Sequence, residues 1–96
     1  MKYSFHPEAE SEFIGAINYY EDKEKGLGYD FALEAYSTIQ RILTHPKAWT
    51  VIEDNIRRSL LRRFPFGILY LHTEEEIFIV AVMHLNREPG YWKERI

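Results

Sequence analysis

Four arginines lie close together in the second half of the chain, at positions 57, 58, 62 and 63. If residues 56–64 form one strand, alternation puts Arg57 and Arg63 on one face and Arg58 and Arg62 on the other. A guanidinium group binds phosphate and carboxylate groups through two parallel hydrogen bonds. The cluster therefore fits an anion-binding surface, and it fits equally well solvated arginines that protect the edge of a sheet.

A second group of polar and aromatic residues follows the last apolar segment. Histidine titrates near neutrality and serves as a general acid or base, arginine neutralises phosphate charge, and an aromatic ring stacks on a nucleic-acid base. In the alternative interpretation the two aromatic rings fold back onto the core and the histidine is a hydrogen-bonded structural residue. The group consists of His84, Arg87, Tyr91, Trp92 and Arg95.

Helical periodicity dominates the first half of the chain. Residues 3–6 favour a short strand, and Pro7 suits the first turn of a helix. Apolar residues then recur at helical spacing as far as Lys23–Lys25. After a tight link at residues 26–28, a second periodic set continues to His45, where Pro46 ends it. The first half therefore predicts a strand followed by a helical hairpin.

Extended patterns replace the helical ones further along. Residues 47–55 show no clear period. Strands are then predicted over 56–64, 68–72 and 77–84, with turns at 65–67 and 73–76. We therefore expect a single α+β domain over residues 1–96, in which a short N-terminal strand, a helical hairpin and a mostly antiparallel three- to four-stranded sheet pack together. The hairpin covers one face of the sheet, and a short C-terminal tail follows.

Charge and composition narrow the class of protein. The net charge is −3, but residues 1–55 carry −5 and residues 56–96 carry +2, so anions are expected to meet the second half. The chain has no cysteine, no apolar signal segment and no apolar run long enough for a membrane. Its four histidines lack metal-ligand spacing, and no phosphate-binding glycine loop or serine hydrolase motif is present. We expect a cytoplasmic protein without metal or cofactor and without a membrane partner.

A series of short motifs runs in order along the chain: Phe5-His6-Pro7-x-Ala9, Tyr19-Tyr20-Glu21, Gly26-Leu27-Gly28, Phe31, Pro46, Arg57-Arg58, Arg63-Phe64-Pro65-Phe66, Tyr70, Ile79–His84 and Arg87-x-Pro89-x-Tyr91-Trp92-x-x-Arg95. Their order resembles the RelE/ParE superfamily, the plasmid stabilisation toxins of type II toxin–antitoxin systems, over essentially the whole chain. The Phe64-Pro65-Phe66 turn and the Pro-x-Tyr-Trp-x-x-Arg ending are closer to the ParE-labelled group.

The resemblance implies a growth-inhibiting toxin that a cognate antitoxin neutralises. ParE-like members act on DNA gyrase, whereas RelE-like members are metal-independent endoribonucleases that cleave messenger RNA on the ribosome. The net acidic charge and the absence of lysine from residues 48–63 favour gyrase. A third possibility is a non-toxic module that only binds the antitoxin. If the protein is a ribonuclease, the positions that match the catalytic pattern are Arg58, Arg63, His84, Arg87 and Tyr91. The residues expected to bind a target or partner are Arg57, Arg62, Trp92 and Arg95.

Overall fold

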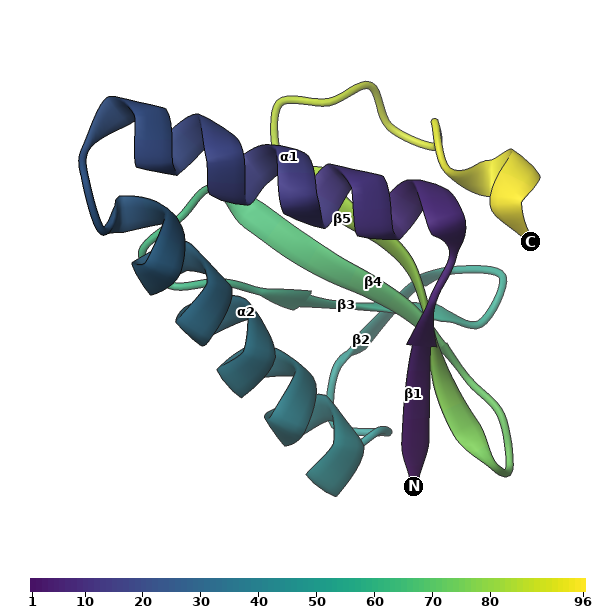
Figure 1. Ribbon diagram of the computed structural model, residues 1–96. Helices are drawn as coiled ribbons and strands as arrows, with labels where there is room; N and C mark the ends of the chain where they lie inside the picture. The colour runs from purple at the N-terminus through teal and green to yellow at the C-terminus, as the bar shows by residue number, and fades with distance from the viewer.

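The computed structural model describes all 96 residues as two helices and five strands, with a short 3₁₀ turn in the C-terminal tail. Both helices cover the same face of the sheet (Figure 1). The predicted α+β class is thereby confirmed. The elements are β1 (Lys2–Phe5), α1 (Pro7–Lys23), α2 (Leu27–Thr44), β2 (Thr50–Glu53), β3 (Ile56–Leu60), β4 (Phe66–His72), β5 (Glu76–His84) and η1 (Lys93–Arg95).

The strands form one mixed sheet in the order β1-β5-β4-β3-β2. The antiparallel run β3-β4-β5 is the predicted meander. The first strand pairs parallel with β5, and the helical hairpin carries the chain from β1 to β2 at the opposite edge of the sheet. The sheet has five strands, one more than the upper limit of the sequence prediction.

The additional strand, β2, lies within the stretch that showed no clear period. It pairs antiparallel with β3 through a two-residue turn, Asp54 and Asn55, whose φ angles are both positive. Aspartate and asparagine tolerate this left-handed conformation, which a tight hairpin of this kind requires. The Asp-Asn pair was thus the sequence signal for the hairpin.

The predicted strand over 56–64 is too long. β3 ends at Leu60, and β4 already begins at Phe66, inside the predicted turn. The Glu34 carboxylate of α2 accepts hydrogen bonds from the backbone N–H groups of Arg62 and Arg63. Those groups are therefore directed to a helix and not to a neighbouring strand, and residues 61–65 form a loop.

The two helices are joined by a short link that one side chain stabilises. The Glu21 carboxylate accepts hydrogen bonds from the backbone N–H groups of Gly26 and Gly28, at 3.0 and 3.1 Å. A Cβ atom on Gly28 would lie 2.5 Å from the backbone oxygen of Ile17. Glycine at position 28 therefore allows α2 to begin directly against α1. The second helix begins at Leu27, inside the link expected at residues 26–28.

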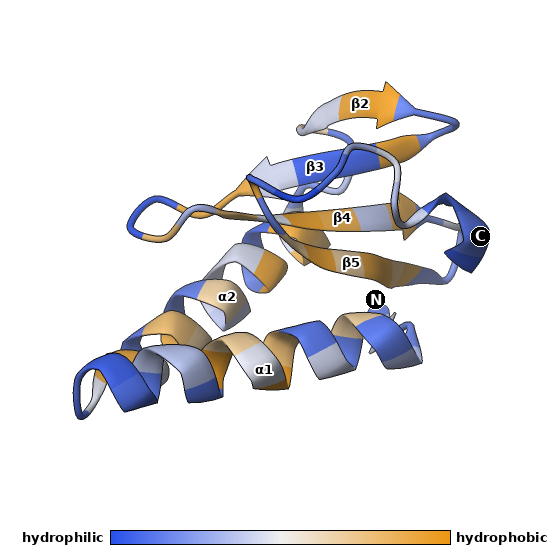
Figure 2. Cartoon of the chain, turned by 90° about the horizontal axis from the view of Figure 1, so that it is seen from above, coloured by the Kyte–Doolittle hydropathy of each residue, from blue (hydrophilic) through white to orange (hydrophobic).

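The sheet separates two hydrophobic clusters of unequal size. We call the side that α1 and α2 cover the helix face and the opposite side the tail face. The helix face buries a cluster of fifteen residues, and the tail face buries a cluster of six that includes Trp92. The hydropathy colouring shows that β4 and β5, which lie between the two clusters, are largely hydrophobic strands (Figure 2). Neither helix combines the length and apolar composition that a membrane span requires.

Candidate functional site

The edge of β5 is completed by side chains where the first strand stops. β1 pairs with β5 only as far as Ile79, whose carbonyl accepts a hydrogen bond from the backbone of His6. Beyond that point the N–H of Val82 donates to Glu12 Oε1 at 3.0 Å, and the carbonyl of Val80 accepts from Arg95 at 3.1 Å. Glu12 and Arg95 thus replace the hydrogen bonds that a longer β1 would make.

These two side chains also form a two-pronged ion pair. The Arg95 Nη1 and Nη2 atoms lie 3.0 and 2.8 Å from the two Glu12 carboxylate oxygens. The exposed fractions are 8% for the Arg95 side chain and 15% for the Glu12 side chain, so water screens the pair only weakly. Arg95 additionally lies 3.7 Å from Glu8 at the start of α1. The pair joins the tail to the first helix.

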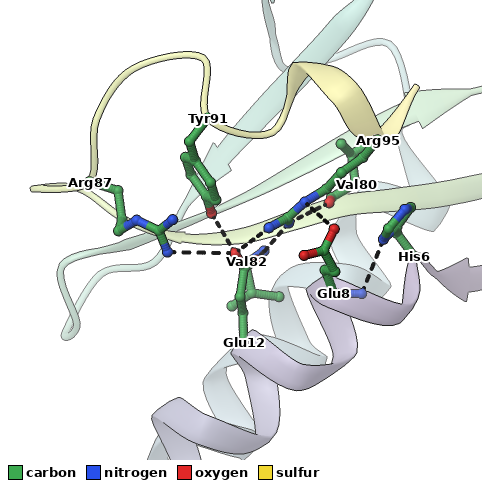
Figure 3. A network of polar contacts seen from close by, with 8 residues as sticks. All are labelled: His6, Glu8, Glu12, Val80, Val82, Arg87, Tyr91 and Arg95. Carbon is green, nitrogen blue, oxygen red and sulfur yellow. Dashed lines mark hydrogen bonds and ion pairs between the residues drawn. The ribbon is translucent and has the colours of Figure 1, made fainter.

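Two further tail residues converge on the same carboxylate. The Tyr91 hydroxyl donates to Glu12 Oε2 at 2.8 Å. The Arg87 guanidinium stacks over the Tyr91 ring at 3.8 Å from its centre and lies 3.8 Å from Glu12 Oε2. Figure 3 shows this arrangement between the tail, α1 and β5. We call the five side chains the Glu12 network; they are Glu8, Glu12, Arg87, Tyr91 and Arg95.

The network raises the pKa values of two of its members, Tyr91 and Arg95. Burial raises the pKa of the Tyr91 hydroxyl, and the hydrogen bond to Glu12 together with its negative charge raises that pKa further. The hydrogen bond to Glu12 also raises the pKa of Arg95. Tyr91 therefore stays protonated at neutral pH as a hydrogen-bond donor. A general base needs a pKa near the working pH, and Tyr91 does not meet that condition.

His84 lies at the end of β5, beside the network. Its Nδ1 accepts a hydrogen bond from the backbone N–H of Asn86 at 3.0 Å, and its ring packs edge-on against Phe66 at 5.0 Å. His84, Arg87 and Glu12 line a cavity of about 190 Å³. Of the five predicted catalytic residues, the structure brings together His84, Arg87 and Tyr91 in this region.

The other two predicted catalytic residues lie elsewhere. Arg58 pairs in register with Leu69 and lies on the tail face. Arg63 lies in the loop before β4, where its guanidinium is 3.5 Å from Asp30 of α2. Neither lines the cavity of His84 and Arg87. The five residues are thus divided among three places on the molecule.

The residues predicted to bind a target or partner also differ in their environments. Arg57 lies opposite Tyr70, on the face opposite to that of Arg58 as expected, and donates to the backbone carbonyls of Lys47 and Trp49 at 3.1 and 2.7 Å. Arg62 is exposed but lies in the loop, so the predicted alternation does not extend to it.

Two of the expected binding residues are buried. Trp92 is only 3% exposed and packs in the tail-face cluster, as the core-capping interpretation anticipated. Arg95 is enclosed in its ion pair with Glu12. Neither side chain is accessible as an anchor in this structure. Both instead hold the tail against the sheet.

Glu12 was missed by the sequence analysis, although a signal for it exists. Ala9 and Ala16, three residues before and four after it, are both buried. On a helix these positions lie on the same side as Glu12. A glutamate between two small buried residues on one helical stripe is expected to face protein and therefore to need a partner.

Comparisons with known proteins identify the fold. No family model matches the chain, and no curated protein matches it. Among solved structures, a chain of the chromosomal ParDE TA system from P. aeruginosa superimposes with a TM-score of 0.62. The match covers 90% of this chain and 97% of that chain, at 17% sequence identity. The chain therefore has the fold of a component of a ParDE toxin–antitoxin system.

Proposed function

We propose that the protein is the toxin of a type II toxin–antitoxin system, neutralised by a cognate antitoxin, and that it inhibits DNA gyrase in the manner of ParE-like toxins. The fold shared with a chain of a ParDE system supports the toxin–antitoxin assignment. The motif order of the sequence supports the toxin over the antitoxin. An acidic, apolar-dotted antitoxin segment that folds on binding is the expected partner.

The dispersal of the candidate catalytic residues is the observation that carries the choice of target. Metal-independent RNA cleavage requires an acid, a base and a cation within hydrogen-bond reach of one phosphate. Arg58 and Arg63 lie away from His84, and Tyr91 is held as a donor to Glu12. Inhibition of a protein target needs exposed anchoring side chains but no convergence on one atom.

The charge of the chain supports the same choice. Binding to RNA on the ribosome is driven by the neutralisation of many phosphates. The net charge is −3, and of the seven basic residues in the second half Arg63, Arg87, Lys93 and Arg95 already face carboxylates. Binding to a protein such as gyrase does not require the neutralisation of many phosphates.

The runner-up is a RelE-like endoribonuclease, and one observation favours it. His84 and Arg87 line the same cavity, so an acid or base and a phosphate-binding cation lie together. In that function the double substitution His84→Ala and Arg87→Ala removes messenger RNA cleavage. Retained cleavage by this variant would exclude both residues from catalysis.

Induction of the protein with separate pulse labelling of new protein and new DNA distinguishes the two targets. Gyrase inhibition should stop DNA synthesis first, induce the DNA-damage response and filamentation, and spare early translation. Ribosomal cleavage should stop translation within minutes while DNA synthesis continues, which would contradict the proposal. We expect a small acidic open reading frame beside the gene, and its co-expression should restore growth. Normal growth despite tight antitoxin binding would instead identify a non-toxic binding module.

A further inference from the structure

A cavity of about 230 Å³ opens on the tail face, away from the Glu12 network. It lies where β2 and β3 approach the end of β5 and the tail. The apolar part of its lining comes from Ile52, Met83 and Trp92, and the charged part from Glu53, Arg58 and Lys93. The cavity therefore combines a hydrophobic wall with a small number of charges, which is the usual composition of a specific binding site.

The three charges are not equivalent. Lys93 and Glu53 form an ion pair at 2.6 Å and neutralise each other at the rim. The Arg58 side chain forms no hydrogen bond and no ion pair. The arginine side chains that do form such contacts are Arg41, Arg57, Arg63, Arg87 and Arg95. Arg58 is a partly buried residue, and its guanidinium has no carboxylate within ion-pair distance.

The position of Arg58 is built into the sheet. A Cβ atom on Gly67 of β4 would lie 3.2 Å from Arg58 Cγ and 3.3 Å from Arg58 Cδ. The missing side chain at position 67 thus lets the aliphatic stem of Arg58 lie across the neighbouring strand. An arginine whose stem is held in this way loses little further conformational freedom when it binds an anion, and this favours affinity.

We propose that this cavity binds an acidic side chain of an extended, apolar segment of a protein partner, with Arg58 as the group that receives the carboxylate. A guanidinium pairs with a carboxylate through two hydrogen bonds, and the apolar wall accommodates an adjacent hydrophobic side chain. If the proposed function holds, the antitoxin is the source of this segment, and only this identification rests on the proposed function.

The charges around the cavity favour a carboxylate over a nucleic acid. Glu53 lines the cavity, Asp54 follows it directly, and Glu88 and Glu94 lie in the adjoining tail. A polyphosphate chain would bring repeated negative charge towards these acidic residues, of which Lys93 neutralises only Glu53, and it would find one unpaired arginine in the cavity. A single carboxylate in an otherwise apolar segment requires one cation and meets little of this repulsion.

The test is an NMR titration of the full chain labelled with ¹⁵N arginine. The probe is a synthetic peptide that alternates leucine with serine and carries one central glutamate, and its matched control replaces that glutamate with glutamine. The Arg58 Nε–H signal should shift saturably with the glutamate peptide and not with the glutamine peptide. The substitution Arg58→Gln should weaken binding of the glutamate peptide roughly tenfold or more, because a charge-assisted hydrogen-bond pair is lost.

Two further variants separate the site from general charge effects. Gly67→Ala keeps Arg58 but displaces its stem, so it should also weaken binding of the glutamate peptide. Lys25→Gln removes an exposed cation in the link between the helices, outside the lining of the cavity, and should leave binding unchanged. Thermal melting of each variant checks that it is folded. Equal binding of both peptides, an equal loss with Lys25→Gln, or a response to an RNA oligonucleotide or to inorganic phosphate in place of the peptide would overturn the proposal. Because the titration does not depend on growth inhibition, its failure is distinguishable from failure of the proposed function.

Discussion

The two faces of the sheet are stabilised in different ways. On the helix face, aromatic rings form the centre of the cluster: Phe31 lies 5.0 to 6.1 Å from the rings of Phe13, Tyr20, Phe64 and Phe66. On the tail side a smaller cluster is covered by a segment that charged groups hold in place. The helix face therefore supplies most of the hydrophobic stabilisation, and the tail depends on specific polar contacts.

The largest expected effect is on the helix face. Phe31 is 0% exposed, and Phe31→Ala removes the ring that joins both helices to β4 and to the preceding loop. We expect a loss of roughly 3–5 kcal/mol in the free energy of unfolding, because the lost burial and the remaining cavity both contribute. Urea denaturation followed by circular dichroism measures this loss. A change below about 1 kcal/mol would show that the aromatic cluster does not dominate stability.

Glu12→Gln should have the next largest effect. The substitution removes the buried counter-charge of the Arg95 guanidinium and leaves only the exposed Glu8 carboxylate, 3.7 Å away, which costs about 3 kcal/mol. The loss should be local to the tail: hydrogen exchange at the Val82 amide, which donates to Glu12, should accelerate more than exchange in β4. Uniform acceleration of hydrogen exchange across the sheet would instead show that the ion pair stabilises the whole domain against global unfolding.

A double variant sharpens that result. In Glu12→Gln with Arg95→Met, neither charge is present, so no unpaired ion is left in the interior. We expect the double variant to be more stable than Glu12→Gln alone, because much of the single-variant cost comes from the stranded guanidinium. Parallel urea titrations give the comparison. Additive losses from the two substitutions would argue that the pair contributes no coupling.

High pH should weaken the helix face through Tyr70. Burial raises the pKa of its hydroxyl to about 12, although the charge of Arg57 lowers it, and the hydroxyl donates to the Pro46 carbonyl at 2.7 Å. An unfolded tyrosine has a pKa of about 10, so the folded state holds this proton more tightly. The contribution is intact below pH 10 and is lost as the pH rises towards 12.

The urea midpoint of the wild type should therefore fall between pH 10 and pH 12. In Tyr70→Phe the midpoint should be lower at pH 8, because the Pro46 carbonyl loses its donor, and should fall less on the way to pH 12. Tyr91→Phe is the matched control, because it removes a tail hydroxyl whose pKa is also raised and leaves Tyr70 in place. A Tyr70→Phe profile parallel to that of the wild type would contradict this assignment.

The smallest effect is expected at Lys93, two residues before Arg95 on the same 3₁₀ turn. Its ion pair with Glu53 is short, but the side chains are 53% and 42% exposed, so water and salt screen it. We expect Lys93→Met to leave the melting temperature unchanged within error at physiological salt. A clear decrease in the melting temperature, comparable with that of Glu12→Gln, would mean that the difference in exposure does not decide how much each ion pair contributes to stability.

The helices were predictable from the sequence because their signals are local. Pro7 begins α1 and Lys23 ends it, as the periodicity indicated. Glu12 was not recognised because Glu8, Glu10 and Glu12 together are explained by the positive end of the helix dipole, where acidic residues are expected. Its partners, Tyr91 and Arg95, are 79 and 83 positions away. No local pattern contains that information.

The errors in the strands have the same origin. β3 ends at Leu60 because Glu34 of α2, 28 positions before Arg62, accepts the backbone N–H groups that follow the strand. The residues themselves are compatible with an extended strand. β2, by contrast, was predictable in principle from the Asp54-Asn55 pair, and was missed because Thr50–Glu53 is short and mostly exposed. Exposed edge strands carry little alternation of apolar and polar residues.

The meeting of both chain ends at β5 determines an order of folding. The helical hairpin and the β3-β4-β5 meander close short loops, whereas the β1–β5 pair and the Glu12–Arg95 contact join segments separated by most of the chain. Loop closure of that length is entropically costly and slow, so we expect these contacts to form last. The edge of β5 is then the last part of the sheet to be protected. Until β1 and the tail dock, a strand from another molecule is able to add there, and this is the step at which the nascent domain is most exposed to aggregation.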